Sequence, residues 1–172
     1  FVGIRTILFW LAPSLALFIV LRAHIVRVAL GSGLFSWEDT RLSAAVLAAL
    51  SLAMLAEGLA SLLIKGYYAL ENTWRPFFIN IGASILSIGL SLWLATILAA
   101  HTSLGIKITG IFRIGDLPFP EPVGLALGFS IGLILNIAIL YKALMMLARK
   151  KFGKVEHFPA GAVIKIFLAA IF

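Results

Sequence analysis

Long apolar runs constrain this chain more than any other feature of its sequence. Four of them cover residues 4–30, 37–64, 74–100 and 121–148, and a fifth covers residues 159–172, where the sequence stops. About 20 apolar residues in a helix cross the hydrocarbon core of a bilayer, and each of the first four runs is longer than that. Because lipid offers no hydrogen-bond partners to the backbone, we expect an all-α integral membrane protein, built as a bundle of transmembrane helices.

The composition supports this class and excludes several functions. Hydrophobic residues make up 62% of the chain and charged residues only 12%, whereas a soluble domain carries about 25% charged residues. The chain has no cysteine, so disulfides and thiolate metal sites are excluded, and we expect no metal site. The net charge is +7, and in such a chain basic residues usually mark loops that face anionic lipid, so no nucleic-acid partner is expected.

The sequence starts without methionine and stops inside an apolar run. We therefore expect residues 1–172 to be one transmembrane region of a longer chain.

The segment Lys65–Pro76 is the clearest polar connection between two runs. It opens with two tyrosines, a residue type enriched where hydrocarbon meets headgroups. Asn72 or Thr73 can cap the helix that follows, and Pro76 falls in its first turn, where a missing N–H does no harm. The sequence therefore predicts a tight hinge at a membrane face.

Ser36 and Asp39 predict a capping box at the start of the second run.

The basic residues are unevenly divided between the two ends of the predicted bundle. If the runs alternate in direction, nine lie on the hinge side and five on the other. Because cytoplasmic loops carry an excess of lysine and arginine, the hinge side is predicted to be cytoplasmic. The nine are Arg5, Lys65, Arg75, Lys142, Arg149, Lys150, Lys151, Lys154 and Lys165, and the five are Arg22, Arg27, Arg41, Lys107 and Arg113.

The connection from His101 to Pro120 is the longest in the chain and is rich in glycine and proline. Its segment Ile106–Ile114 alternates weakly between apolar and polar residues. This alternation predicts a short β-hairpin lying on the membrane.

Small residues recur at every fourth position in three of the runs, which places each set on one helix face. Such ridges let helix backbones approach closely where lipid provides no hydrophobic driving force. We therefore expect close packing along each ridge. The ridges are Ala45, Ala49, Ala53, Glu57 and Ser61; Ala83, Ser87, Ser91 and Ala95; and Gly124, Gly128, Gly132 and Asn136.

Four polar residues inside the runs are candidates for substrate binding. Glu57 and Asn136 lie on packing ridges, so each either locks two helices together or contacts an ion or headgroup in a central cavity. Arg22 and Arg27 lie near one end of the first run, where their side chains either extend to the membrane interface or attract a phosphate.

The sequence contains no catalytic motif such as HExxH, GxSxG or a P-loop, and an enzyme is not expected.

Three motifs follow one another in a recognisable order. The first run ends in Val-Ala-Leu-Gly-Ser-Gly-Leu-Phe (28–35), the hinge reads Gly-Tyr-Tyr-Ala-Leu-Glu-Asn-Thr-Trp-Arg-Pro (66–76), and the fourth run opens Val-Gly-Leu-Ala-Leu (123–127). In this order the chain resembles the second lobe of the MviN/MurJ family, the lipid II flippases of the MOP exporter superfamily, whose fold is MATE-like. The resemblance covers nearly the whole chain.

This resemblance implies a fold of two six-helix lobes and two trailing helices, of which the runs here would be helices nine to thirteen. It implies a multi-pass protein of the bacterial inner (plasma) membrane that flips undecaprenyl-pyrophosphate-linked peptidoglycan precursor, lipid II, from the inner to the outer leaflet by alternating access. The implied partners are this precursor, membrane lipids and a coupling ion, without a cofactor. The family's cleft arginines lie mostly in the first lobe and in the helix before Phe1, so none is carried over to a residue here. The alternatives are another exporter of the superfamily, either a polysaccharide-lipid flippase or a MATE-type exporter, and a non-transporting structural membrane module.

Overall fold

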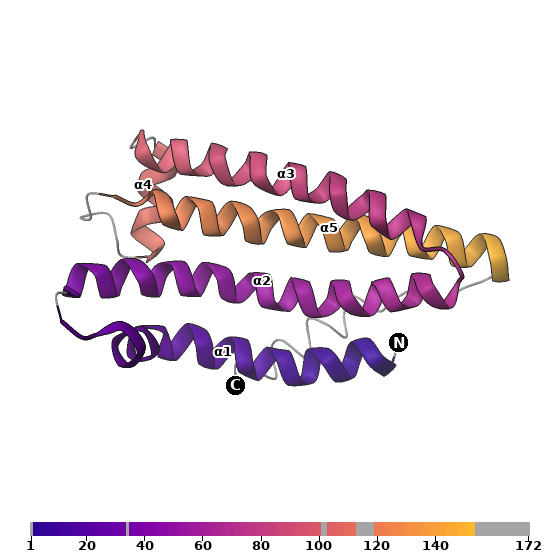
Figure 1. Ribbon diagram of the computed structural model, residues 1–172, viewed down its shortest axis with the longest axis horizontal. Helices are drawn as coiled ribbons and strands as arrows, with labels where there is room; N and C mark the ends of the chain where they lie inside the picture. Colours follow the sequence, from indigo (N-terminus) through magenta and orange to yellow (C-terminus); the bar gives the residue numbers. More distant parts are fainter. Residues whose placement is uncertain (1, 34, 101–102, 113–118, 154–172) are drawn as a thin grey trace.

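The computed structural model describes residues 2–33, 35–100, 103–112 and 119–153. Within them the chain forms α1 (Val2–Leu30), α2 (Trp37–Ala69), α3 (Trp74–Ala99), α4 (Ser103–Phe112) and α5 (Glu121–Phe152) (Figure 1). All of these helices except α4 are long and apolar enough to cross a membrane. The predicted all-α membrane class is thus confirmed. The predicted run at 159–172 lies outside the described residues.

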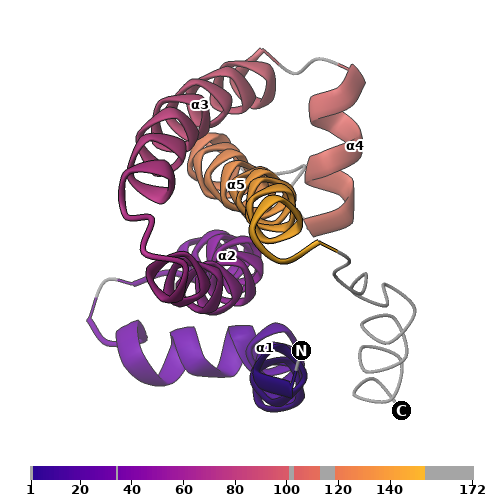
Figure 2. The ribbon, with the colours of Figure 1, turned by 90° about the vertical axis from the view of Figure 1, so that its right-hand side faces the viewer.

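The helix boundaries at the first connection follow the predicted capping chemistry. The backbone N–H of Asp39 donates to the Ser36 hydroxyl at 3.1 Å, and the Asp39 carboxylate accepts from the Ser36 backbone N–H at 2.9 Å. This reciprocal pair is the predicted capping box, and α2 begins directly after Ser36. Before it, α1 ends at Leu30, and Gly33 adopts a φ of 67° in the connection, a conformation that favours glycine. Figure 2 shows that α1 bends, so that its last turns run across the bundle.

Helix α5 lies at the centre of the arrangement, between α3 on one side and α2 on the other (Figure 2). Its contact with α3 is the most extensive in the fold. The glycine ridge makes this contact, because Gly124, Gly128 and Gly132 are all buried against the small-residue ridge of α3. A Cβ at Gly124 would lie 2.8 Å from the Ala95 Cα, so the two backbones touch there. The predicted close packing of these two ridges is confirmed.

Helix α2 packs on the opposite side of α5 through a face rich in alanine. Ala45 and Ala49 of the predicted ridge are buried. The Ser130 hydroxyl of α5 donates across the interface to the Ala49 carbonyl at 2.7 Å. Nearer the hinge, the fully buried Tyr67 donates its hydroxyl to the Leu140 carbonyl at 2.9 Å. These two bonds set the alignment of α2 and α5 at points 18 residues apart on α2.

The hinge between α2 and α3 is shorter than the sequence predicts. Helix α2 continues through Ala69, beyond the predicted end at residue 64, so the first part of the predicted hinge is helical. Glu71 adopts a φ of 58° in the remaining turn. Asn72 then accepts the backbone N–H of Arg75 at 3.3 Å through its side-chain oxygen, as expected of a capping residue. The buried Tyr67 explains the longer helix, because its hydroxyl bond to α5 holds the last turns of α2 in place.

The prediction of a β-hairpin around Ile106–Ile114 is wrong for the described part of that segment. Residues 103–112 form α4, which crosses the end of the bundle away from the hinge (Figure 1). Ile108 and Phe112, four residues apart and so on one helical face, pack against the buried cluster of Ala45, Leu98 and Val123. Packing of this face against the bundle favours a helix over an isolated hairpin.

Candidate functional site

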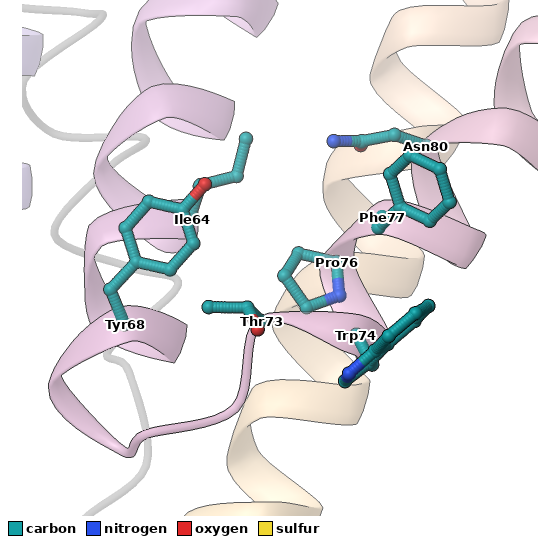
Figure 3. Close-up of a pocket in the computed structure, with 7 residues that line it drawn as sticks. All are labelled: Ile64, Tyr68, Thr73, Trp74, Pro76, Phe77 and Asn80. Carbon is teal, nitrogen blue, oxygen red and sulfur yellow. The ribbon is translucent and has the colours of Figure 1, made fainter.

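A pocket opens between the last turns of α2 and the first turns of α3. Helices α2 and α3 touch little beyond the turn that joins them, because each packs on α5 instead. The hinge pocket, as we call this space, has a volume of about 460 Å³. Figure 3 shows its walls, and its lining residues are Ile64, Tyr68, Thr73, Trp74, Pro76, Phe77 and Asn80.

A second, smaller pocket lies between α3 and α5 and adjoins the first. This inner pocket has a volume of about 180 Å³, and Asn136 of the glycine ridge lines it together with Ser84 and Ser87. The Asn136 side-chain amide donates to the Asn80 side-chain oxygen at 3.0 Å, so this pair stands between the two pockets. Within the described part of the chain, the buried Ser87 hydroxyl and the Asn136 side-chain oxygen have no hydrogen-bond partner. Buried polar atoms of this kind usually bind water or another polar group.

Glu57 does not lie on the buried face of α2, although the ridge to which it belongs predicts that it faces protein. Its side chain is exposed in the structure, whereas Ala45 and Ala49 are buried. The cause is helical geometry, because each step of four residues overshoots a full turn by about 40°, and three steps separate Ala45 from Glu57. Glu57 instead shares a face with Ile64, seven residues on, and with Tyr68, both of which line the hinge pocket.

Glu57 and Asn136 lie in the same stretch of the bundle. Along α2, Glu57 falls between Ala49 and Tyr67, whose partners on α5 are Ser130 and Leu140. Asn136 falls between those partners, so both candidate residues lie between these two hydrogen bonds, although they share no hydrogen bond with each other.

The arginine pair lies at the opposite end of the bundle from the hinge. The Arg27 guanidinium donates to the Thr40 hydroxyl at 3.4 Å and lies 5.7 Å from the centre of the Trp37 ring. It thereby clamps the end of α1 to the start of α2, which favours a structural role. Arg22 is half-buried and makes no such contact with the described residues. About 30 Å of helix separates the start of α2 from Glu57, so the four candidates do not form one site.

Sequence reasoning did not predict the hinge pocket. Tyr68 was expected only to mark the membrane face, and Asn80 was not singled out, yet both line the pocket. The signal for Asn80 was present, because an asparagine six residues into an apolar run is as unusual as Asn136. Within the described residues, no three histidine, cysteine, aspartate or glutamate side chains lie close enough to hold a metal ion.

Comparison with known proteins decides the family. The family model described as lipid II flippase MurJ matches residues 2–172. The chain belongs to the MurJ lipid II flippase family. A member from Thermosipho africanus (strain TCF52B), named lipid II flippase MurJ, is 29% identical over 154 residues, which cover 90% of this chain and 28% of that protein. No solved structure matches the chain.

The chain therefore spans just over a quarter of the length of the MurJ relative that it matches. The match covers α1 to α5, and the family is one of membrane transporters, in agreement with the four helices able to span a bilayer. The sequence resemblance to the MurJ family is thus confirmed, and the activity of the whole protein follows as a proposal.

Proposed function

We propose that this chain is part of a transporter that moves lipid II from the inner to the outer leaflet of the bacterial inner membrane by alternating access. The observation that carries the proposal is the match of the MurJ family model to residues 2–172. A single motif can arise by chance, but a match over every described helix ties the whole bundle to this family. The substrate is an undecaprenyl-pyrophosphate-linked peptidoglycan precursor, and a coupling ion is a further proposed partner.

The polar side chains at mid-depth support a face that borders a hydrated cavity. Glu57 is exposed on α2, and Asn136, which binds Asn80, lies in the same stretch of the bundle. An ionised carboxylate in contact with hydrocarbon would be unfavourable by about 2.5–3.5 kcal/mol on insertion scales. A face with this carboxylate and two amides is therefore better suited to water or protein than to lipid. We infer that Glu57 borders the transport cavity and modulates transport, without binding the anionic pyrophosphate directly.

The charge distribution supports an orientation with the hinge in the cytoplasm. At the hinge end, α5 closes on three consecutive basic residues, Arg149, Lys150 and Lys151. Lys65 and Arg75 flank the turn between α2 and α3, where both are exposed. Under this orientation Arg22 lies towards the outer surface, where its guanidinium is a candidate for contact with the pyrophosphate before release.

A lipid II protection assay with the full-length protein tests this proposal. In cells depleted of their own flippase, an externally added enzyme that cleaves lipid II reaches only precursor that has been moved outward. We expect the full-length protein to restore cleavage, Glu57→Gln to retain most of it, and Glu57→Leu to lose much of it. Normal cleavage with Glu57→Leu would remove the role assigned to Glu57. No cleavage with the wild-type protein, despite normal expression, would contradict the flippase function itself.

A further inference from the structure

The hinge pocket combines apolar walls with two polar side chains that can donate hydrogen bonds, Tyr68 and Asn80. The Asn80 side-chain oxygen is occupied by Asn136, and its amide nitrogen points into the space between α2 and α3 (Figure 3). The Tyr68 hydroxyl points towards the same space, and the Tyr68 side chain is exposed. A ligand that satisfies both groups must therefore present acceptor oxygens next to an apolar body.

The walls of the pocket are built to receive such an apolar body. Ile64 stands on the α2 side, and Pro76 and Phe77 stand on the α3 side. Trp74, which also lines the pocket, stacks on Phe78 with ring centres 5.9 Å apart. Tryptophan and tyrosine are the residues that anchor proteins at the boundary between hydrocarbon and headgroups. The volume of about 460 Å³ falls within the range of about 300–1,000 Å³ found for ligand pockets.

The charge around this end of the bundle selects the sign of the ligand. Lys65 lies three residues before Tyr68, on the same side of α2, and is exposed. Arg75 and the three basic residues that close α5 lie at the same end, against the single acid Glu71 in the turn. Basic residues near an anionic membrane surface are attracted to its headgroups, so an anionic ligand is favoured here.

We propose that the hinge pocket binds one anionic glycerophospholipid of the surrounding membrane. Its ester oxygens accept hydrogen bonds from Tyr68 and Asn80, one acyl chain lies against Ile64 and Phe77, and its phosphate faces Lys65. This lipid is distinct from the transported precursor, and the site stands on the geometry of the pocket whether or not the protein flips lipid II. Bound there, it ties the turn between α2 and α3 to the membrane surface.

Native mass spectrometry of the purified full-length protein, titrated with phosphatidylglycerol, tests the site. Ile64→Trp fills the pocket, and we expect it to remove the tightest-bound phosphatidylglycerol. Ile85→Trp makes the same change at an exposed position of α3 outside the pocket and should leave binding unchanged. Tyr68→Phe deletes one hydrogen bond and should weaken binding by about two- to tenfold. Tyr68→Phe keeps the ring and the fold, so it decides the question if Ile64→Trp fails to fold.

Three results would overturn the proposal. The first is phosphatidylglycerol binding that is unchanged in Tyr68→Phe and in folded Ile64→Trp, which would mean that the pocket is not the site. The second is equal retention of phosphatidylcholine with the same acyl chains, which would remove the selection by charge. The third is displacement of phosphatidylglycerol by equimolar undecaprenyl pyrophosphate in the wild type, which would assign the pocket to the transported substrate. Loss of lipid II cleavage in the protection assay with phosphatidylglycerol binding intact would contradict the flippase function and leave the site standing.

Discussion

The contact between α3 and α5 depends on the missing side chain at Gly128. A Cβ built there would meet the backbone of Ser91, with the amide nitrogen at 2.5 Å and the Leu90 carbonyl carbon at 2.7 Å. These are backbone atoms, so no rotamer change can move them out of the way. Gly128→Ala therefore forces the two helices apart until these contacts reach an ordinary separation.

The required movement sets the size of the effect. The Ser91 Cα lies nearest to such a Cβ, and ordinary contacts begin near 3.4 Å, so α3 and α5 must separate by about 1 Å at this point. A gap of 0.5–1 Å loses roughly a quarter to a half of the dispersion energy of each contact across it. Overpacking of this kind is typically destabilising by about 1–3 kcal/mol. The better helix propensity of alanine offsets about 1 kcal/mol at most.

The matched control is Gly89→Ala, in α3, where an added Cβ meets no atom within 4 Å. Thermal unfolding of the purified full-length protein, followed by tryptophan fluorescence in one detergent, compares the two variants. We expect Gly128→Ala to unfold at a lower temperature than the wild type, and Gly89→Ala to unfold at the same or a higher temperature. Equal stability of the two variants would refute the argument that backbone contact at Gly128 holds α3 against α5.

Three further predictions follow from other parts of the bundle. Tyr67→Phe deletes the hydroxyl bond to Leu140 and should destabilise the protein by about 0.6 kcal/mol and at most about 1.7 kcal/mol, the average and the maximum measured for hydrogen bonds between membrane helices. Denaturation in mixed detergent measures this, and an unchanged midpoint would contradict it. A cysteine at Asn72 should react with an impermeant thiol reagent only after the cells are opened, because we place the hinge in the cytoplasm. Efficient labelling in intact cells would contradict this orientation. Gly128→Leu should abolish complementation by the full-length protein, and wild-type growth with this variant would mean that the glycine face is open to lipid.

Features fixed by local chemistry were predictable from the sequence. The capping box at Ser36 and Asp39 formed as expected, because its two bonds join residues only three apart. Close packing of the glycine ridge was also predictable, because Gly124, Gly128 and Gly132 lie on one helix face, although the sequence did not identify α3 as the partner. Apolar composition was enough to locate the four long helices, but not to place the end of α2, which continues through Ala69.

Features set by tertiary contact were not predictable. Tyr67 extends α2 through a bond to a residue 73 positions away, which no local pattern reveals. The segment that contains Ile108 is helical because it packs against the buried cluster around Leu98. The exposure of Glu57 is a different case, because three steps of four residues turn it about 120° from Ala45 around the helix, a drift that the predicted ridge overlooked.

The pairing of Asn136 with Asn80 illustrates the same limit at the candidate site. Sequence reasoning selected Asn136 for its place on the glycine ridge, but its partner lies 56 residues away on α3. Knowledge of which helices are neighbours is needed before two such amides can be matched. The hinge pocket depends on the same knowledge, because its walls come from two helices that touch little beyond their shared turn.

Movement of fluorescent lipid II across the membrane of liposomes that contain only the purified full-length protein tests the central claim most directly. Lipid II left in the outer leaflet is quenched by a membrane-impermeant reagent, and labelled phosphatidylcholine serves as the control lipid. We predict that the protein makes the lipid II of both leaflets reachable while the inner-leaflet phosphatidylcholine stays protected. Lipid II that crosses no faster than in empty liposomes, with the protein folded and inserted, would contradict the assignment of this chain to a lipid II flippase.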